Sequence, residues 1–180
     1  MTTSIKWSID DYHLMIKSGV LNNRLVELIE GEIVEMSPES PLHRFTNDFI
    51  AGYLRKLLAE KAKVFESHPI TLDNSEPEPD ITIVRLPNTN YRDRHPYPED
   101  IYWLVEISNT TLEGDLNIKK RIYANAGINE YWVVDLKHKE LIVFRESSGN
   151  DYKTKATLNN GAIAPIAFPE IPITISTLFK

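Results

Sequence analysis

The sequence has no cysteine, and its 180 residues include only 20 lysines and arginines against 26 aspartates and glutamates. Without cysteine there is no disulfide, no thiolate metal site and no cysteine nucleophile. The formal net charge of −6 argues against a protein that coats nucleic acid through diffuse positive charge. It does not exclude contact with nucleic acid at a single site through a metal ion.

Long apolar runs are also missing. No stretch approaches the roughly 18 apolar residues of a membrane span, and the N-terminus is polar and acidic, unlike a signal peptide. With 42% apolar and 26% charged residues, the composition is that of an ordinary folded domain. We therefore expect a soluble, cytoplasmic protein without a membrane partner, folded as one domain over residues 1–180.

Capping residues, Gly and Pro positions and apolar spacing predict an α/β or α+β fold. The expected order is a helix over 8–18, a hairpin over 25–36, a helix from 41, strands over 64–72, 81–84 and 101–107, a helix over 115–126, strands over 131–136 and 141–145, and a tail along a sheet edge. In the helix from Pro41, the residues Phe45, Phe49, Tyr53 and Leu57 recur every four positions, with Leu54 and Leu58 beside them, and together they predict a broad core-facing stripe. This order gives one sheet with helices packed on it.

Glu106 is the most informative acidic residue, because it follows five apolar residues in the run 101–107. Such a run suits a strand that is buried on both faces at the centre of a sheet. An unpaired carboxylate there is costly to ionise, so Glu106 needs a metal, a cationic side chain or hydrogen-bond donors. The alternative is that the strand ends one residue early and that Glu106 is solvated.

Asp80 is the second candidate, because it follows Pro79 at the mouth of the strand over 81–84. Taken alone, it also fits an aspartate in an ordinary turn. If the two strands are neighbours, Asp80 and Glu106 lie side by side and form a hard-oxygen site of the kind that Mg²⁺ or Mn²⁺ prefers. Such a metal polarises a phosphate and activates water.

A cationic run, Lys119, Lys120 and Arg121, follows Glu106 one turn into the next helix. A helix begins near the C-terminal end of the strand before it, so its first turns can point at Glu106. The helical period places Lys119 and Lys120 on stripes that both carry apolar residues, and it does not choose between them. Arg121 falls on the solvated face, and all three residues also fit a plain charged surface.

Several segments together resemble a known family. They are Val26–Glu32, Ser37-Pro38 with His43, Glu78–Asp80, Val105–Ser108, Asp115 with Lys119, and Tyr123–Trp132. In these segments the chain resembles the Uma-type family of restriction-endonuclease-like proteins, a branch of the PD-(D/E)XK nuclease superfamily. The last segment is the longest and the most specific.

The resemblance implies a restriction-endonuclease-like core, a mixed β-sheet of about four core strands flanked by helices. It implies Asp80 and Glu106 as ligands of Mg²⁺ (or Mn²⁺) and as catalytic residues. The lysine that the superfamily carries two residues after the glutamate is Ser108 here, and Lys119 takes its place. Glu27, Glu32 and His43 match further family positions and are accessory candidates.

The resulting hypothesis is a metal-dependent endonuclease that hydrolyses DNA phosphodiester bonds. The departure at Ser108 and the acidic composition motivate the alternative, an inactive nucleic-acid-binding or interaction module with the same fold. A two-carboxylate glycosidase, active without metal, is a weaker third reading.

The expected DNA contacts are Arg92 and Arg94 on the polar loop over 86–100, and Lys120 beside the site. With a net charge of −6, such binding is expected to be weak and salt-sensitive. Superfamily members often pair to cut two strands, so the resemblance also allows a homodimer.

Overall fold

A mixed six-stranded sheet forms the centre of the computed structural model, which describes residues 4–180. Its strand order is β3-β4-β5-β6-β7-β8, and β5 pairs with β6 in parallel while every other neighbouring pair is antiparallel. The strands are β3 (Lys63–Glu66), β4 (Ile81–Val84), β5 (Ile101–Ser108), β6 (Glu130–Asp135), β7 (Glu140–Ser148) and β8 (Asp151–Leu158).

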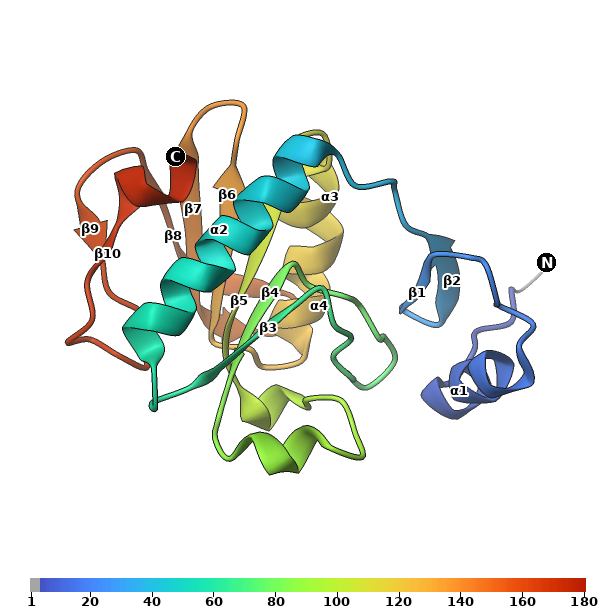
Figure 1. Cartoon of the computed structure of the whole chain (residues 1–180). Coiled ribbons are helices and arrows are strands. Elements are labelled where there is room, and N and C mark those ends of the chain that lie inside the picture. Colours follow the sequence, from blue (N-terminus) through green and yellow to red (C-terminus); the bar gives the residue numbers. More distant parts are fainter. Residues whose placement is uncertain (1–3) are drawn as a thin grey trace.

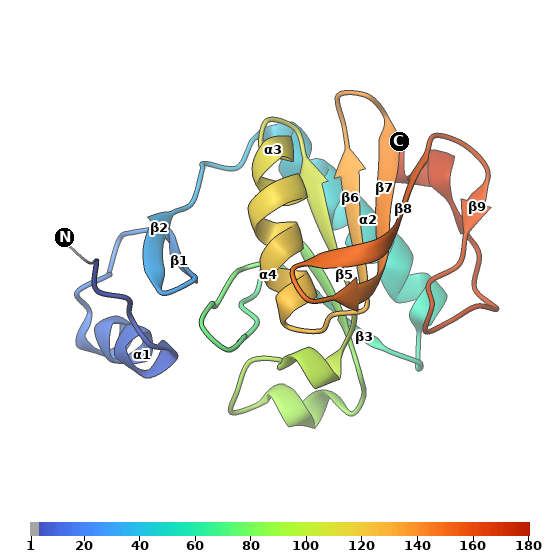
Figure 2. The same ribbon diagram turned by 180° about the vertical axis from the view of Figure 1, so that it is seen from behind.

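Helices cover both faces of this sheet (Figure 1). Helix α2 (Pro41–Leu58) lies across one face, and Ser40 caps it with Pro41 in its first turn. The other face carries one continuous helical segment, seen in front of the sheet in Figure 2, made of α3 (Leu112–Gly114), a π-helical turn η3 (Asp115–Lys119) and α4 (Lys120–Asn125). This segment connects the parallel strands β5 and β6, as a crossover helix must.

The alternating side chains of the strands build two apolar cores. The first lies under α2 and includes Leu54, Trp103 and Trp132, while the second lies under α4 and includes Leu104 and Tyr131. The near-continuous apolar run of β5 is explained by this arrangement, since both faces of the strand are covered. The predicted mixed sheet flanked by helices is confirmed.

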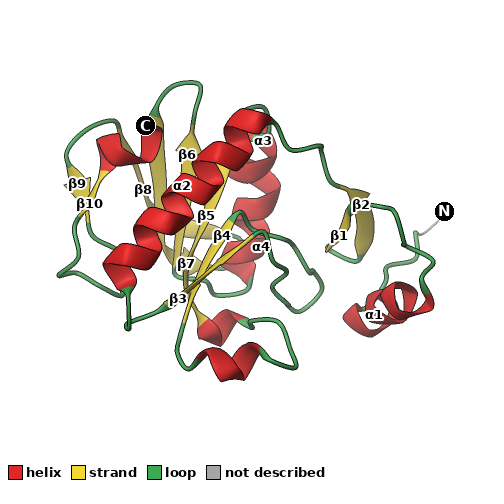
Figure 3. Ribbon diagram, viewed as in Figure 1, coloured by secondary structure: helices red, strands yellow, loops and turns green. Residues whose placement is uncertain are grey.

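The N-terminal residues form a small lobe to one side of the sheet (Figure 1). It contains α1 (Ile9–Ser18) and an antiparallel hairpin of β1 (Val26–Ile29) and β2 (Glu32–Glu35), both as predicted. The loop between β3 and β4 reaches this lobe (Figure 3), and the amide of Glu76 donates to the carbonyl of Leu28 over 2.7 Å. Segments far apart in the sequence are thereby fixed next to each other.

Two predicted details of these elements differ from the structure. In the stripe of α2, Leu54 and Leu58 are buried as predicted and Phe49, Tyr53 and Leu57 pack partly buried against the same core, but Phe45 is 60% exposed. The strand predicted over 64–72 ends at Glu66, because Ser67 adopts a positive φ of 47°.

The C-terminal tail does not extend the main sheet. It forms a separate pair, β9 (Ala162–Ile163) with β10 (Ile173–Thr174), followed by the 3-10 helix η4 (Ile175–Phe179) that packs into the core under α2. The loop over 86–100 carries two short 3-10 helices, η1 (Asn88–Tyr91) and η2 (Pro98–Asp100). Within residues 4–180, no helix has the length and apolarity needed to cross a bilayer.

Candidate active site

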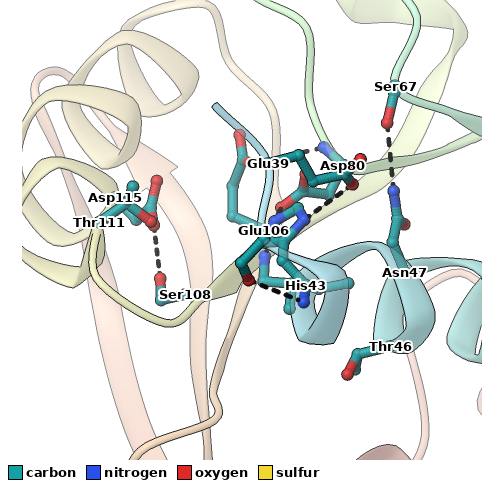
Figure 4. A network of polar contacts seen from close by, with 12 residues as sticks. Glu39, His43, Thr46, Asn47, Ser67, Asp80, Glu106, Ser108, Thr111 and Asp115 are labelled. Atoms are coloured by element: carbon teal, nitrogen blue, oxygen red, sulfur yellow. Dashed lines mark hydrogen bonds and ion pairs between the residues drawn. The ribbon is translucent and has the colours of Figure 1, made fainter. Parts of the chain in front are cut away.

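Asp80 and Glu106 meet where β4 begins beside the C-terminal half of β5. The antiparallel register pairs Ile81 with Val105, which places the residue before β4 next to Glu106. The amide of Asp80 donates to Oε2 of Glu106 over 3.3 Å, and the amide of Ile107 donates to Oδ2 of Asp80 over 2.6 Å. Figure 4 shows the two acidic side chains together with His43 beside them.

Glu106 is a buried carboxylate with few donors. It is 5% exposed, and its main partner is the hydroxyl of Tyr123, which donates to Oε1 over 2.6 Å. Burial raises the pKa of Glu106 well above its ordinary value; the charge of Lys119 opposes this rise, and repulsion from Asp80 and Asp115 adds to it. The folded chain therefore leaves negative charge at this position undercompensated.

Lys119 is the cation that faces this cluster. Its side chain is 15% exposed, and its ammonium donates to Oε2 of Glu27 over 2.6 Å. Burial alone would lower the pKa of Lys119, but the charges of Glu106 and Glu27 outweigh it and raise the pKa above the ordinary value. Lys119 therefore stays charged at neutral pH, and Glu27 from β1 holds it in place.

The π-helical turn decides which lysine faces the site. Lys119 is the last residue of η3, and Lys120 begins α4. Lys120 points to the β8 side, where it pairs with Asp151 at 2.8 Å, and Arg121 pairs with Glu30 at 2.6 Å. Single π-helical turns often occur at functional sites, where the wider turn re-aims side chains.

His43 connects α2 to the cluster. Its Nε2 lies 3.1 Å from Oδ2 of Asp80, and its Nδ1 lies 3.0 Å from Oε1 of Glu39. The hydrogen bond with Asp80 raises the pKa of His43 to about 9, and Glu39 adds a smaller effect in the same direction. At neutral pH His43 is therefore a cation that partly offsets the charge of Asp80.

Ser108 stands at the position where a lysine was expected, and it has a structural partner. Its hydroxyl donates to Asp115 in the helical segment, and the Thr111 hydroxyl donates to the same carboxylate over 2.9 Å. Burial raises the pKa of Asp115 above its ordinary value. The pair fixes the start of the segment that carries Lys119.

The donor chemistry of Asp80 and Glu106 fits a hard divalent cation. Across residues 4–180 no three His, Asp or Glu side chains converge into a protein-only metal cage. Mg²⁺ does not need such a cage, since it keeps several waters and commonly binds through one or two carboxylates plus phosphate oxygens. The undercompensated charge of Glu106 is the structural feature that such a cation would neutralise.

Other predicted residues lie outside this cluster. Glu32 pairs with Lys6 at 2.6 Å and is more than half exposed, so it does not reach Asp80 or Glu106. Arg94 is tied to Asp100 through two hydrogen bonds of 2.6 and 3.2 Å, while Arg92 is exposed on the same loop.

Sequence reasoning missed Tyr123, Asp115 and Glu39 as members of the cluster. Tyr123 and Asp115 lie in segments that matched the family, and Tyr123 falls four residues after Lys119 on the same helical segment. That spacing was the available signal for Tyr123. Glu39 lies four residues before His43, and that spacing was the available signal for its contact with the His43 ring.

Comparisons with known proteins agree with the fold. A solved structure described as "a putative nuclease belonging to DUF820", from Anabaena variabilis ATCC 29413, matches with a TM-score of 0.68 at 16% sequence identity, over 86% of this chain and 89% of that one. At this identity the match shows the fold. No curated protein matched the chain in sequence. A family described as "Uma2: Putative restriction endonuclease" matches residues 9–176, so the chain belongs to the Uma2 family.

Proposed function

We propose that this protein is a Mg²⁺-dependent nuclease that hydrolyses DNA phosphodiester bonds at Asp80 and Glu106. The observation that carries the proposal is the meeting of these two carboxylates with a buried, charged lysine at one end of the sheet. Family membership supports a nuclease, and the donor set supports an oxygen-binding divalent metal.

Asp80 and Glu106 would hold the metal, which when bound supplies Lewis acidity to the phosphate and lowers the pKa of a water. The protein prepares this pair before substrate arrives. The amide of Ile107 fixes one oxygen of Asp80, and the hydroxyl of Tyr123 fixes one oxygen of Glu106. Hydrogen bonds of this kind to metal-binding carboxylates orient them and tune their affinity.

Lys119 would stabilise the negative charge that develops on the phosphate and orient the attacking water. A fixed ammonium in a site that excludes solvent is worth far more than one in water. Glu27 holds this ammonium on one side, so that its remaining N–H bonds can point toward the Asp80–Glu106 pair. Lys119 thereby replaces the missing lysine at Ser108.

Contacts with the rest of the DNA are expected to be few. Arg94 and Lys120 are already paired with Asp100 and Asp151, which leaves Arg92 as the more available loop cation. With a net charge of −6, affinity should be weak and should fall with added salt.

A plasmid-cleavage assay with Mg²⁺ and with Mn²⁺ tests the proposal. Wild type should cleave and lose activity with a chelator, and Asp80→Asn should reduce cleavage by roughly a thousandfold, the scale of losing a main electrostatic group. Asp10→Asn, an exposed carboxylate on α1, is the matched control and should cleave like wild type. Cleavage by Asp80→Asn at the wild-type rate would refute the assignment.

The inactive module is the second candidate, and two observations favour it. The ammonium of Lys119 is engaged with Glu27, and Ser108 replaces the strand lysine. That reading predicts no cleavage by wild type with either metal, together with DNA binding that does not depend on Asp80.

A further inference from the structure

A hollow of about 460 Å³ lies between the first half of α2 and the end of β3. Phe45, Asn47 and Asp48 of α2 line one side of it, and Glu66 and Ser67 line the other. The mechanism proposed above uses none of these residues.

The hollow adjoins the Asp80 side of the candidate site. The amide of Ser67 donates to the carbonyl of Asp80 over 3.0 Å, and Glu39, which also lines the hollow, bonds the ring of His43. Figure 4 shows Asn47 and Ser67 on one side of Asp80, with Ser108 and Asp115 on the other. A ligand in the hollow would therefore be a direct neighbour of a phosphate bound at Asp80.

The charge of the hollow disfavours a second phosphate. Its wall carries Glu39, Asp48 and Glu66 against one cation, Arg44. Glu39 is paired with His43 and Glu66 with Arg55, so the wall has no surplus of positive charge. The occupant that fits is neutral and polar, with N–H groups to donate.

Phe45 supplies an apolar platform. Its ring is 60% exposed although it lies on a helix beside the core, and it stacks on Phe49 with ring centres 6.5 Å apart and an angle of 18° between the planes. Proteins that bind single-stranded nucleic acid stack bases on aromatic side chains, and the exposed ring of Phe45 offers such a surface at the hollow.

Asn47 supplies an unmet hydrogen-bond acceptor. It is 4% exposed, and its Nδ2 donates to Oγ of Ser67 over 3.1 Å. Its Oδ1 is buried and accepts no hydrogen bond from any residue between 4 and 180. A buried acceptor without a donor is costly, so a ligand N–H group near it would be favoured.

We propose that this hollow binds the base of a nucleotide next to the scissile phosphate, with the base stacked on Phe45 and an amino group directed to Asn47. The inference rests on the proposed nuclease function and adds a substrate class to it. A base in the hollow has left its stack, so the substrate is single-stranded or locally unpaired DNA.

Binding of small probes tests this inference without any cleavage. Calorimetric titration in Mg²⁺ with dCMP and with 2-deoxyribose 5-phosphate compares ligands that share sugar and phosphate and differ in the base. Wild type should bind dCMP about tenfold more tightly, the scale of one base stacked on an aromatic ring. Phe45→Ala should abolish the difference, and Phe45→Tyr should keep it.

Leu42→Ala is the matched control, because Leu42 is 53% exposed on the same helix and does not line the hollow. It should leave the tenfold preference unchanged. Equal binding of the two probes by wild type, absence of binding by both, or an unchanged preference in Phe45→Ala would overturn the inference.

The two proposals fail separately. A base preference that depends on Phe45, in a protein that cleaves no DNA, supports the subsite and refutes the nuclease. Metal-dependent cleavage that requires Asp80, in a protein without a base preference, refutes the subsite alone.

Discussion

Two buried glutamates on neighbouring strands are treated very differently by the fold. Glu130 on β6 is fully buried and receives three strong donors, the guanidinium of Arg145 at 2.8 Å, the indole N–H of Trp132 at 2.9 Å and the amide of Ile166 at 2.7 Å. Glu106 on β5 is 5% exposed and receives the hydroxyl of Tyr123 and a long contact from the Asp80 amide.

The difference in hydrogen-bond donors indicates that Glu130 is a structural carboxylate and that Glu106 is a candidate for binding an external ligand. Glu130 joins β6 and β7 to the C-terminal tail, and its charge is satisfied within the chain. Glu106 faces two further acids, Asp80 and Asp115, and burial raises its pKa. A buried carboxylate whose own fold does not satisfy it is a candidate for an external ligand.

The largest expected effect on stability comes from Glu130. Glu130→Gln leaves Arg145 without its counter-charge and should cost about 3 kcal/mol of unfolding free energy, as breaking a buried ion pair does. Glu106→Gln removes a carboxyl whose pKa rises on folding and whose ionisation therefore costs stability at neutral pH, so it should cost much less than Glu130→Gln or raise the stability. Urea denaturation without metal measures the unfolding free energy of both variants. Similar losses in the two variants would contradict the difference proposed between the two glutamates.

The adjacent residues Lys119 and Lys120 allow a similar comparison for activity, between a lysine that faces the candidate site and one that does not. Lys119→Met should slow DNA cleavage about a hundredfold, because it removes a positioned charge from the site. Lys120→Met, whose ammonium pairs with Asp151, is the matched control and should change the rate by less than about threefold. Steady-state cleavage rates of the two variants measure the difference, and equal losses of rate would contradict the placement of Lys119 at the site.

His43 should make the stability of the protein depend on pH. Its pKa rises from 6.5 to about 9 on folding, so the protonated ring stabilises the protein fully below pH 6.5, and this stabilisation is lost as the pH rises toward 9. The stability advantage of wild type over His43→Gln should be on the order of 2 kcal/mol at pH 6 and should shrink toward pH 10. An advantage that stays constant over this range would contradict the His43–Asp80 contact.

The smallest effect concerns Tyr123, the main donor to Glu106. Tyr123→Phe should weaken Mn²⁺ binding about tenfold, as loss of a partner that orients a metal ligand does. Tyr131→Phe removes another buried hydroxyl bond, to the carbonyl of Asp115, and should cost similar stability without changing Mn²⁺ affinity. Titration of both variants with Mn²⁺ separates positioning of Glu106 from general packing.

Asp80 and Glu106 could be predicted from the sequence because each lies in or next to a recognisable apolar strand segment. The apolar run ending at Glu106 identified a strand covered on both faces, and the antiparallel pairing of β4 with β5 brings Asp80 beside it. The apolar run is continuous rather than alternating, so it marks the strand β5 itself, while the register that pairs Ile81 with Val105 is known only from the structure.

The remaining features depend on geometry that a regular helical period cannot express. The turn over Asp115–Lys119 is π-helical, so counting at 3.6 residues per turn does not decide between Lys119 and Lys120. The pairing of Lys119 with Glu27 joins residues 92 positions apart and needs the N-terminal lobe in place. Within the predicted stripe of α2, Leu54 and Leu58 are buried, but Phe45, in the first turns of the helix, is exposed.

Binding of Mn²⁺ to the resting protein tests the central claim most directly. Calorimetric titration should show one site in wild type that is weakened at least about tenfold in both Asp80→Asn and Glu106→Gln, since each removes one of its two carboxylates. Mn²⁺ binding that is absent in wild type, or that both variants retain at wild-type affinity, would contradict the assignment of Asp80 and Glu106 as the metal site.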